Sequence, residues 1–141
     1  MKTLYDAIYC ANSIEPQSDS GSTITGITVD TKGFNSGVLR FRANKGTGTT
    51  SIVVSLEESD TAVGGFAPAL DNTGAAIGAT IVATDHAAEV LARIEGLGLN
   101  RKRYLHIKSV STLGSGAVAV FGEILLGNAF NKPVNTAVSN T

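Results

Sequence analysis

Tryptophan is absent from this chain of 141 residues, and cysteine and methionine each occur once. One cysteine cannot form an internal disulfide, and with no second sulfur ligand and no histidine near it in the sequence, it does not indicate a zinc site. We therefore predict that Cys10 is a small buried apolar residue, and that the protein holds no metal and no cofactor. Charged residues are also scarce: they make up 16% of the chain, against roughly 25% in average domains.

Neither sign of charge dominates. The chain has 11 basic and 12 acidic residues, for a formal net charge of -1, so no overall field would attract nucleic acid or anionic lipid. Its apolar runs are shorter than the ~20 residues that cross a bilayer, and its first residues, MKTLYDAIYCAN, lack the apolar core of a secretory signal. We expect a soluble protein made in a reducing cytoplasm, with neither nucleic acid nor membrane among its partners.

Sequence motifs that carry enzymatic chemistry are missing as well. In KGTGTT, Lys45 precedes the glycines, whereas a phosphate-binding loop ends in Gly-Lys-Ser or Gly-Lys-Thr and runs into a helix. Glu57 and Glu58 are neighbours, so in a strand they point to opposite faces and cannot act together on one substrate. Asp85 and His86 are adjacent in a predicted loop, but no nucleophile-elbow motif supplies a serine beside them. We predict no catalytic residues.

The chain does contain segments in which apolar residues occur at every second position, most clearly from Arg101 to Gly127 in RKRYLHIKSVSTLGSGAVAVFGEILLG. Two runs of alternating apolar residues meet there at a Gly-Ser-Gly turn, and period two predicts a long β-hairpin. In the first run, His106 falls on the outer face. The second run is largely apolar on both faces, so we place it in the centre of a sheet or beneath a subunit contact.

The same alternation marks earlier strands. GVLRFRAN directs Arg40 and Arg42 outward and Leu39, Phe41 and Ala43 inward. SIVVSLEES alternates in the same way and predicts a half-buried antiparallel strand. ITGITVD and ATIVAT predict shorter strands on either side, and the Gly-rich and Ala-rich stretch from 60 to 79 predicts an irregular excursion with at most short strands.

One segment is ambiguous. In DHAAEVLARIEGLG, apolar residues satisfy period two and also helical spacing. We favour a strand, because Gly96 and Gly98 limit a helix and the neighbouring elements are all β. About eight strands with turn signals between them then predict an all-β protein, a jelly-roll-like antiparallel β-sandwich with N- and C-terminal arms. The predicted sandwich spans 24–127, after an N-terminal arm or lead-in over 1–23 and before a polar C-terminal tail over 128–141.

The chain has one notable basic cluster, formed by Arg101, Lys102, Arg103 and Lys108 with Tyr104 among them. Phosphate contacts with stacked bases are one hypothesis, although the overall charge balance disfavours it. A solvated face is the second. The third is that the cluster pairs with acidic residues of a protein partner and sets the register of that contact.

Two runs, SIVVSLEESDTAVGGFAPA and KRYLHIKSVSTLGSGAVAVFGEILLGNAFNKPV, together resemble the small structural proteins of tailed bacteriophages. The shared pattern is a strand ending in L-x-E-S-D before a variable loop, an Arg-Tyr-apolar strand, an apolar strand closing near Leu-Leu-Gly, and a tail with proline. The resemblance covers about residues 37 to 134. It implies a jelly-roll or related sandwich that acts as a capsid decoration or cement protein on the outside of the head shell, without catalytic residues.

Such a role predicts the major capsid protein and further copies of the same chain, as a dimer or trimer, as partners, because closed symmetry lets one protein match a symmetric shell position. We expect it on the capsid surface of the virion, after assembly in the host cytoplasm. The alternatives are a phage tail or baseplate component and a carbohydrate-binding module, which the absence of tryptophan disfavours. The predicted contact residues are Arg40, Arg42, Leu91, Arg101, Lys102, Arg103, Tyr104, Phe121 and Leu125, with the two termini as arms.

Overall fold

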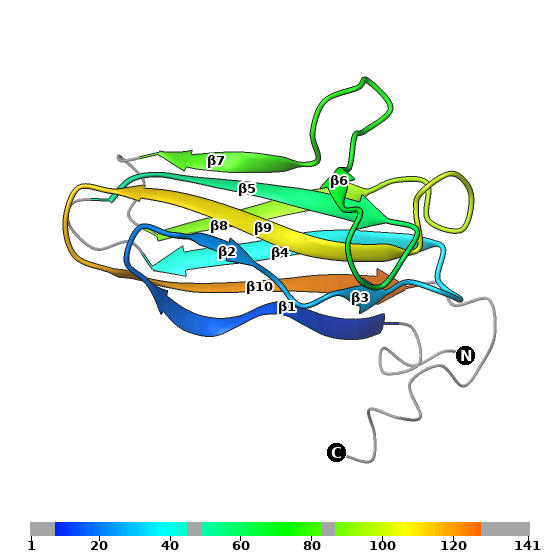
Figure 1. The fold of residues 1–141 in the computed structure, drawn as a ribbon, viewed down its shortest axis with the longest axis horizontal. Coiled ribbons are helices and arrows are strands. Elements are labelled where there is room, and N and C mark those ends of the chain that lie inside the picture. The colour runs from blue at the N-terminus through cyan, green and yellow to red at the C-terminus, as the bar shows by residue number, and fades with distance from the viewer. Residues whose placement is uncertain (1–7, 45–48, 83–86, 128–141) are drawn as a thin grey trace, which may run out of the picture.

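The computed structural model describes residues 8–44, 49–82 and 87–127, and every regular element within these ranges is a β-strand (Figure 1). The strands pack as two antiparallel sheets, face to face, which confirms the predicted all-β sandwich. In chain order they are β1 (Ile8–Asp19), β2 (Thr23–Thr25), β3 (Val29–Asp30), β4 (Ser36–Asn44), β5 (Thr49–Ser59), β6 (Ala67–Pro68), β7 (Gly78–Val82), β8 (Ala87–Ile94), β9 (Tyr104–Leu113) and β10 (Val118–Gly127).

The order of the strands defines a jelly roll. The first sheet runs β1-β10-β4-β8, and the second runs β2-β9-β5-β6, with β3 also on β9 and β7 also on β5. Because β2 and β3 share one side of β9, and β6 and β7 share one side of β5, each pair stands for one interrupted strand. Counted in this way, the chain changes sheets at every connection except the one after β5, which is jelly-roll connectivity.

Alternation predicted the inward faces correctly. The inward residues of both sheets form one continuous core between them, where burial of apolar area is the main stabilising contribution. The ambiguous segment is the strand β8, as predicted, and β10 lies between β1 and β4, in the centre of its sheet. The buried hydrophobic residues of β4, β5 and β10 are Leu39, Phe41, Ala43, Ile52, Val54, Leu56, Val118, Val120, Ile124 and Leu126.

The predicted hairpin is wrong. β9 pairs with β2, β3 and β5 in the second sheet, whereas β10 pairs with β1 and β4 in the first. The Gly-Ser-Gly turn therefore carries the chain across the core from one layer to the other. Period two did not distinguish the two arrangements, because two strands that face each other across a core show the same alternation as two strands that pair.

The predicted N-terminal arm is also wrong over most of its length. Residues 8–19 form β1, an edge strand of the first sheet, and its pairing with β10 shifts register between Asn12 and Ile14 and between Ile14 and Gln17. These irregularities and Pro16 obscured the strand pattern in the sequence. Cys10 is exposed on β1, opposite Leu125, rather than buried as predicted. Residues 1–7 and the predicted tail 128–141 lie outside the described residues.

A buried joint ties β1 to the second sheet at the point where the predicted strand over 24–30 is interrupted. The Ser13 hydroxyl accepts a hydrogen bond from the Ile107 amide at 2.9 Å and donates to the Ile27 carbonyl at 3.0 Å. The Gly26 amide donates to the Ile107 carbonyl at 2.8 Å. A Cβ at Gly26 would lie 2.2 Å from the Ser13 Oγ, so only glycine fits between these chains. The joint splits one predicted strand into β2 and β3.

Candidate interaction surfaces

The outer face of the first sheet carries five of the predicted contact residues. Register places the Arg40 position of β4 between Leu91 of β8 and Glu123 of β10, and Arg42 beside Phe121. We call the outward side chains of this sheet the first-sheet surface. Its members on β4, β8 and β10 are Val38, Arg40, Arg42, Glu89, Leu91, Arg93, Phe121, Glu123 and Leu125.

Apart from Arg93, the charged side chains of the first-sheet surface form ion pairs across neighbouring strands. Arg40 contacts Glu123 at 3.0 Å and Glu89 at 3.5 Å, and Arg42 contacts Glu89 at 3.2 Å. Both contacts to Glu89 reach its Oε2 atom. The two predicted contact cations, Arg40 and Arg42, therefore both have acidic partners within the chain.

Apolar side chains lie between and beside these ion pairs. Leu91 is 62% exposed, while Phe121 and Leu125 are half-buried. Two shallow grooves border the surface. One, of about 730 Å³, runs past Val38 and Leu125 at the end where β10 finishes, and the other, of about 640 Å³, lies beside Phe121.

The predicted basic cluster lies on the second sheet, at the start of β9. The Arg101 side chain is 8% exposed and contacts the Glu58 carboxylate at 3.1 Å, and it also donates to the Leu70 carbonyl at 2.8 Å and to the Glu95 carbonyl at 2.9 Å. It therefore joins the end of β5, the excursion after β5 and the loop before β9. These three contacts point to a structural role for Arg101.

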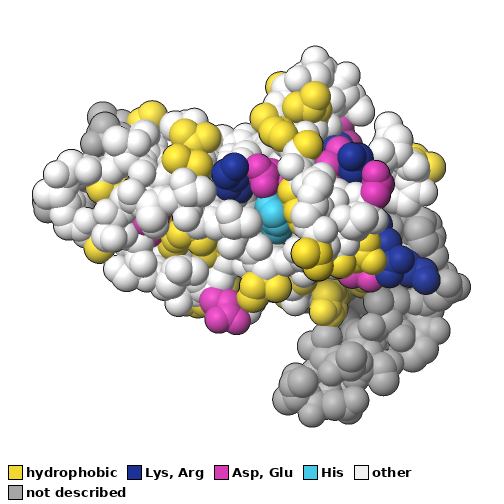
Figure 2. Space-filling view, in the orientation of Figure 1, with side chains coloured by type: hydrophobic (Ala, Val, Ile, Leu, Met, Phe, Trp, Pro, Cys, Tyr) yellow, Lys and Arg dark blue, Asp and Glu magenta, His cyan; other side chains and the backbone are white. Residues whose placement is uncertain are grey.

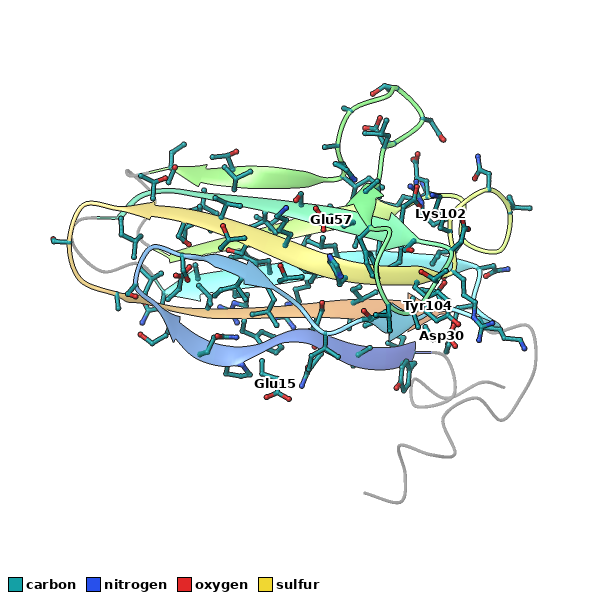
Figure 3. All side chains as sticks on the ribbon, viewed as in Figure 1. Glu15, Asp30, Glu57, Lys102 and Tyr104 are labelled. Carbon is teal, nitrogen blue, oxygen red and sulfur yellow. The ribbon has the colours of Figure 1, made fainter. Side chains whose placement is uncertain are left out.

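The next two cations also have acidic partners in the same chain. Lys102 lies 3.6 Å from Asp60, and Arg103 donates two hydrogen bonds to Asp30, each at 2.7 Å. Figure 3 shows Asp30, Lys102 and Tyr104 together at one end of the sandwich. The hydrogen bonds from Arg103 hold the pKa of Asp30 below its ordinary value. The guanidinium of Arg103 also lies 5.0 Å from the centre of the Tyr104 ring, a cation–π contact.

His106 lies on the outer face of β9, as predicted, but it is 4% exposed. Its Nε2 atom lies 2.7 Å from Glu57, and the Phe66 ring of the excursion stacks on it with centroids 4.0 Å apart. Figure 2, which looks onto this sheet, shows the histidine among carboxylate and basic side chains. Burial opposes ionisation of Glu57, but hydrogen bonds from His106 and Lys108 lower its pKa overall. The contacts of His106 with Glu57 and Phe66 therefore hold the irregular segment 60–79 against the second sheet.

Glu57 and Glu58 contact different partners, His106 and Arg101, in line with their predicted opposite directions. Asp85 and His86 lie outside the described residues. Within the described ranges no group of three or more His, Cys, Asp and Glu side chains is placed to hold a metal ion. That part of the chain also contains no helix long and apolar enough to cross a membrane.

No protein-family model matches this sequence, and no curated protein matches it. Among solved structures, the fold is similar to a chain in "Structure of infectious bursal disease virus Gx strain", with a TM-score of 0.53 and 9% sequence identity. The match covers 89% of this chain and 34% of that chain, so this chain spans about a third of the other's length. At this identity the likeness is one of fold, and it agrees with the jelly-roll order of the strands.

Proposed function

We propose that this chain is a virion structural protein, a jelly-roll subunit that binds and stabilises the head shell of a tailed bacteriophage as a decoration or cement protein. The observation that carries the proposal is the jelly-roll connectivity, a fold that viral shells use, together with its likeness to a chain of a virus structure. The resemblance of residues 37 to 134 to phage structural proteins supports the same role. On this proposal the chain works by binding, without catalysis.

The first-sheet surface is the proposed shell contact. Four of its five charged side chains, Arg40, Arg42, Glu89 and Glu123, form ion pairs between strands, while Leu91, Phe121 and Leu125 expose apolar area beside them. A rigid, four-stranded support holds these side chains in fixed positions. Such a surface fits a partner of matching shape, and many copies on one shell multiply a modest affinity per site.

Sedimentation with undecorated heads of the parent phage tests the proposal. The full chain is expected to co-sediment at a fixed ratio to the major capsid protein and to raise the temperature at which the heads disrupt. If the chain stays in the supernatant at every ratio, the proposed function is wrong. Assembly into rings with no binding to heads would instead support a tail or baseplate component.

Matched double variants test the contact surface. Phe121→Ser with Leu125→Ser removes apolar area from the first-sheet surface, and we expect affinity for the heads to fall by roughly tenfold or more. Val53→Ser with Val110→Ser removes two cross-strand neighbours, 44% and 39% exposed, from the second sheet and should leave binding unchanged. Circular dichroism establishes that both variants fold. If only the second-sheet variant loses binding, the proposed contact surface is wrong.

A further inference from the structure

The two edges of the first sheet are built differently. β1, at one edge, has two register shifts and contains Pro16, and Glu15 points away from the sandwich beneath it (Figure 3). Bulges, proline and charge are the devices by which proteins keep an edge strand from pairing with another chain. β8, at the other edge, runs for eight residues against β4 with no register shift and no proline. The edge formed by β8 lacks those backbone defences.

The outward side chains of β8 follow a self-complementary order. Glu89, Leu91 and Arg93 alternate along its outer face, with the 62% exposed leucine between one negative and one positive side chain. Arg93 forms no ion pair within the described part of its own chain. Both arginines that contact Glu89 use its Oε2 atom, so Oε1 stays open to a further cation.

We propose that β8 pairs antiparallel with β8 of a second copy, about a two-fold axis at Leu91 that is perpendicular to the sheet. In this register Leu91 faces Leu91 of the second copy. Glu89 then faces Arg93 of the second copy, and Arg93 faces its Glu89, so both charges are matched twice by symmetry. Backbone hydrogen bonds join the two four-stranded sheets into one continuous sheet.

Other registers of the same two-fold arrangement fit less well. Each must shift by two residues to keep the outward faces together. A shift in one direction places Glu89 opposite Leu91 and Arg93 opposite Ala87, so neither charge has a partner. A shift in the other direction places Glu89 opposite Glu95, where two negative charges repel. Only the register centred on Leu91 satisfies both charges.

The direction of this two-fold axis also affects shell binding, an inference that rests on the proposed function. Because the axis is perpendicular to the sheet, the first-sheet surfaces of both copies point in the same direction. A dimer would then present two identical contact surfaces side by side, and the second contact would form at a high effective concentration. The pairing of β8 itself does not depend on shell binding.

Light scattering and native mass spectrometry of the purified full chain test the pairing. We expect a species of twice the 14.5 kDa chain mass, in a concentration-dependent equilibrium with the monomer. Arg93→Glu should yield a monomer, because Glu89 would then face a glutamate of the second copy. Glu89→Arg should also yield a monomer, because two arginines would then face each other. A mixture of these two variants should regain a dimer with one chain of each kind, since both contacts in it pair opposite charges.

Glu15→Arg is the matched control for Glu89→Arg, because it makes the same change of charge at the opposite edge of the same sheet. It should leave the dimer intact, and mixing it with Arg93→Glu should not restore dimers to the latter. The inference is overturned if the wild-type chain is a monomer or a trimer, if Arg93→Glu leaves the dimer intact, or if the mixture forms no mixed dimer. A monomer that still co-sediments with heads would refute the pairing alone, whereas a dimer that does not bind heads would refute the proposed function alone.

Discussion

The two outer faces of the sandwich use their charges differently. On the first sheet, Arg40 and Arg42 pair with carboxylates on adjacent strands, so the ion pairs lie flat on a regular sheet. On the second sheet, Arg101 and Arg103 pair with residues of other segments and fasten loops to strand ends. The first arrangement leaves apolar side chains exposed on a rigid support, whereas the second stabilises the chain's own fold. Charge alone therefore does not identify a binding surface, because arginines on both faces have acidic partners within the chain.

Of the substitutions that test this contrast, one at Arg101 is expected to lower the free energy of unfolding the most. Its side chain is 8% exposed and that of Glu58 is 16% exposed, so Arg101→Met leaves a mostly buried carboxylate with the Lys102 amide as its remaining donor, and two carbonyls without the arginine donor. Breaking a buried pair in this way typically costs 3–5 kcal/mol, and we expect roughly 3 kcal/mol because Glu58 keeps some contact with water. Denaturant unfolding followed by circular dichroism measures the loss.

Lys102→Met is the matched control, since Lys102 is the next residue and pairs with the 77% exposed Asp60. Its expected cost is below about 0.5 kcal/mol. Equal effects of the two substitutions would contradict the structural role assigned to Arg101.

The second-largest loss of stability is expected at Asp30, to which Arg103 donates two hydrogen bonds. Asp30→Asn removes the charge and should cost about 1 kcal/mol at neutral pH, the upper value for an exposed pair with good geometry. The folded-state pKa of Asp30 is lowered, so the unfolded chain binds the proton more readily. The stabilisation is therefore complete above the ordinary pKa of about 3.9 and is lost as the pH falls through the folded-state pKa.

Unfolding free energies measured from neutral pH down to about pH 3 check this dependence. The difference between wild type and Asp30→Asn should shrink as the pH falls below about 4. A difference that stays constant over the whole range would show that the carboxylate charge is not what stabilises this end of the sandwich.

Much of the fold could be predicted because β4 and β5 alternate cleanly and the inward apolar residues of β10 keep period two, and a side chain's face follows from period two alone. β1 was missed because bulges interrupt its period, and the hairpin was wrong because facing strands and paired strands share one pattern. Sheet order depends on contacts between residues far apart in the chain, which local alternation does not encode.

The charged residues of the candidate surfaces could be picked out in the sequence, but their ion-pair partners could not. Arg101 and Glu58 are 43 residues apart, and they meet because β5 and β9 pair with Ser59 opposite Tyr104. That register brings the end of LEESD beside the start of the RKRY run, so acidic and basic residues that look independent in the sequence neutralise each other. Leu91 was a predicted contact residue, but the local sequence did not show that its strand, β8, lies at the edge of the sheet.

The smallest effect is expected at Arg42, which is 58% exposed and shares Glu89 with Arg40. Arg42→Ala should cost only about 0.3 kcal/mol in unfolding experiments, because Glu89 keeps its other partner and water replaces the lost contact. A loss above about 1 kcal/mol, measured by denaturant unfolding in parallel with Arg101→Met, would exceed what an exposed pair contributes. It would mean that the ion pairs of the first-sheet surface stabilise the fold as those of the second sheet do. A small loss leaves these charges free to act in recognition, where they disfavour partners that lack matching charges.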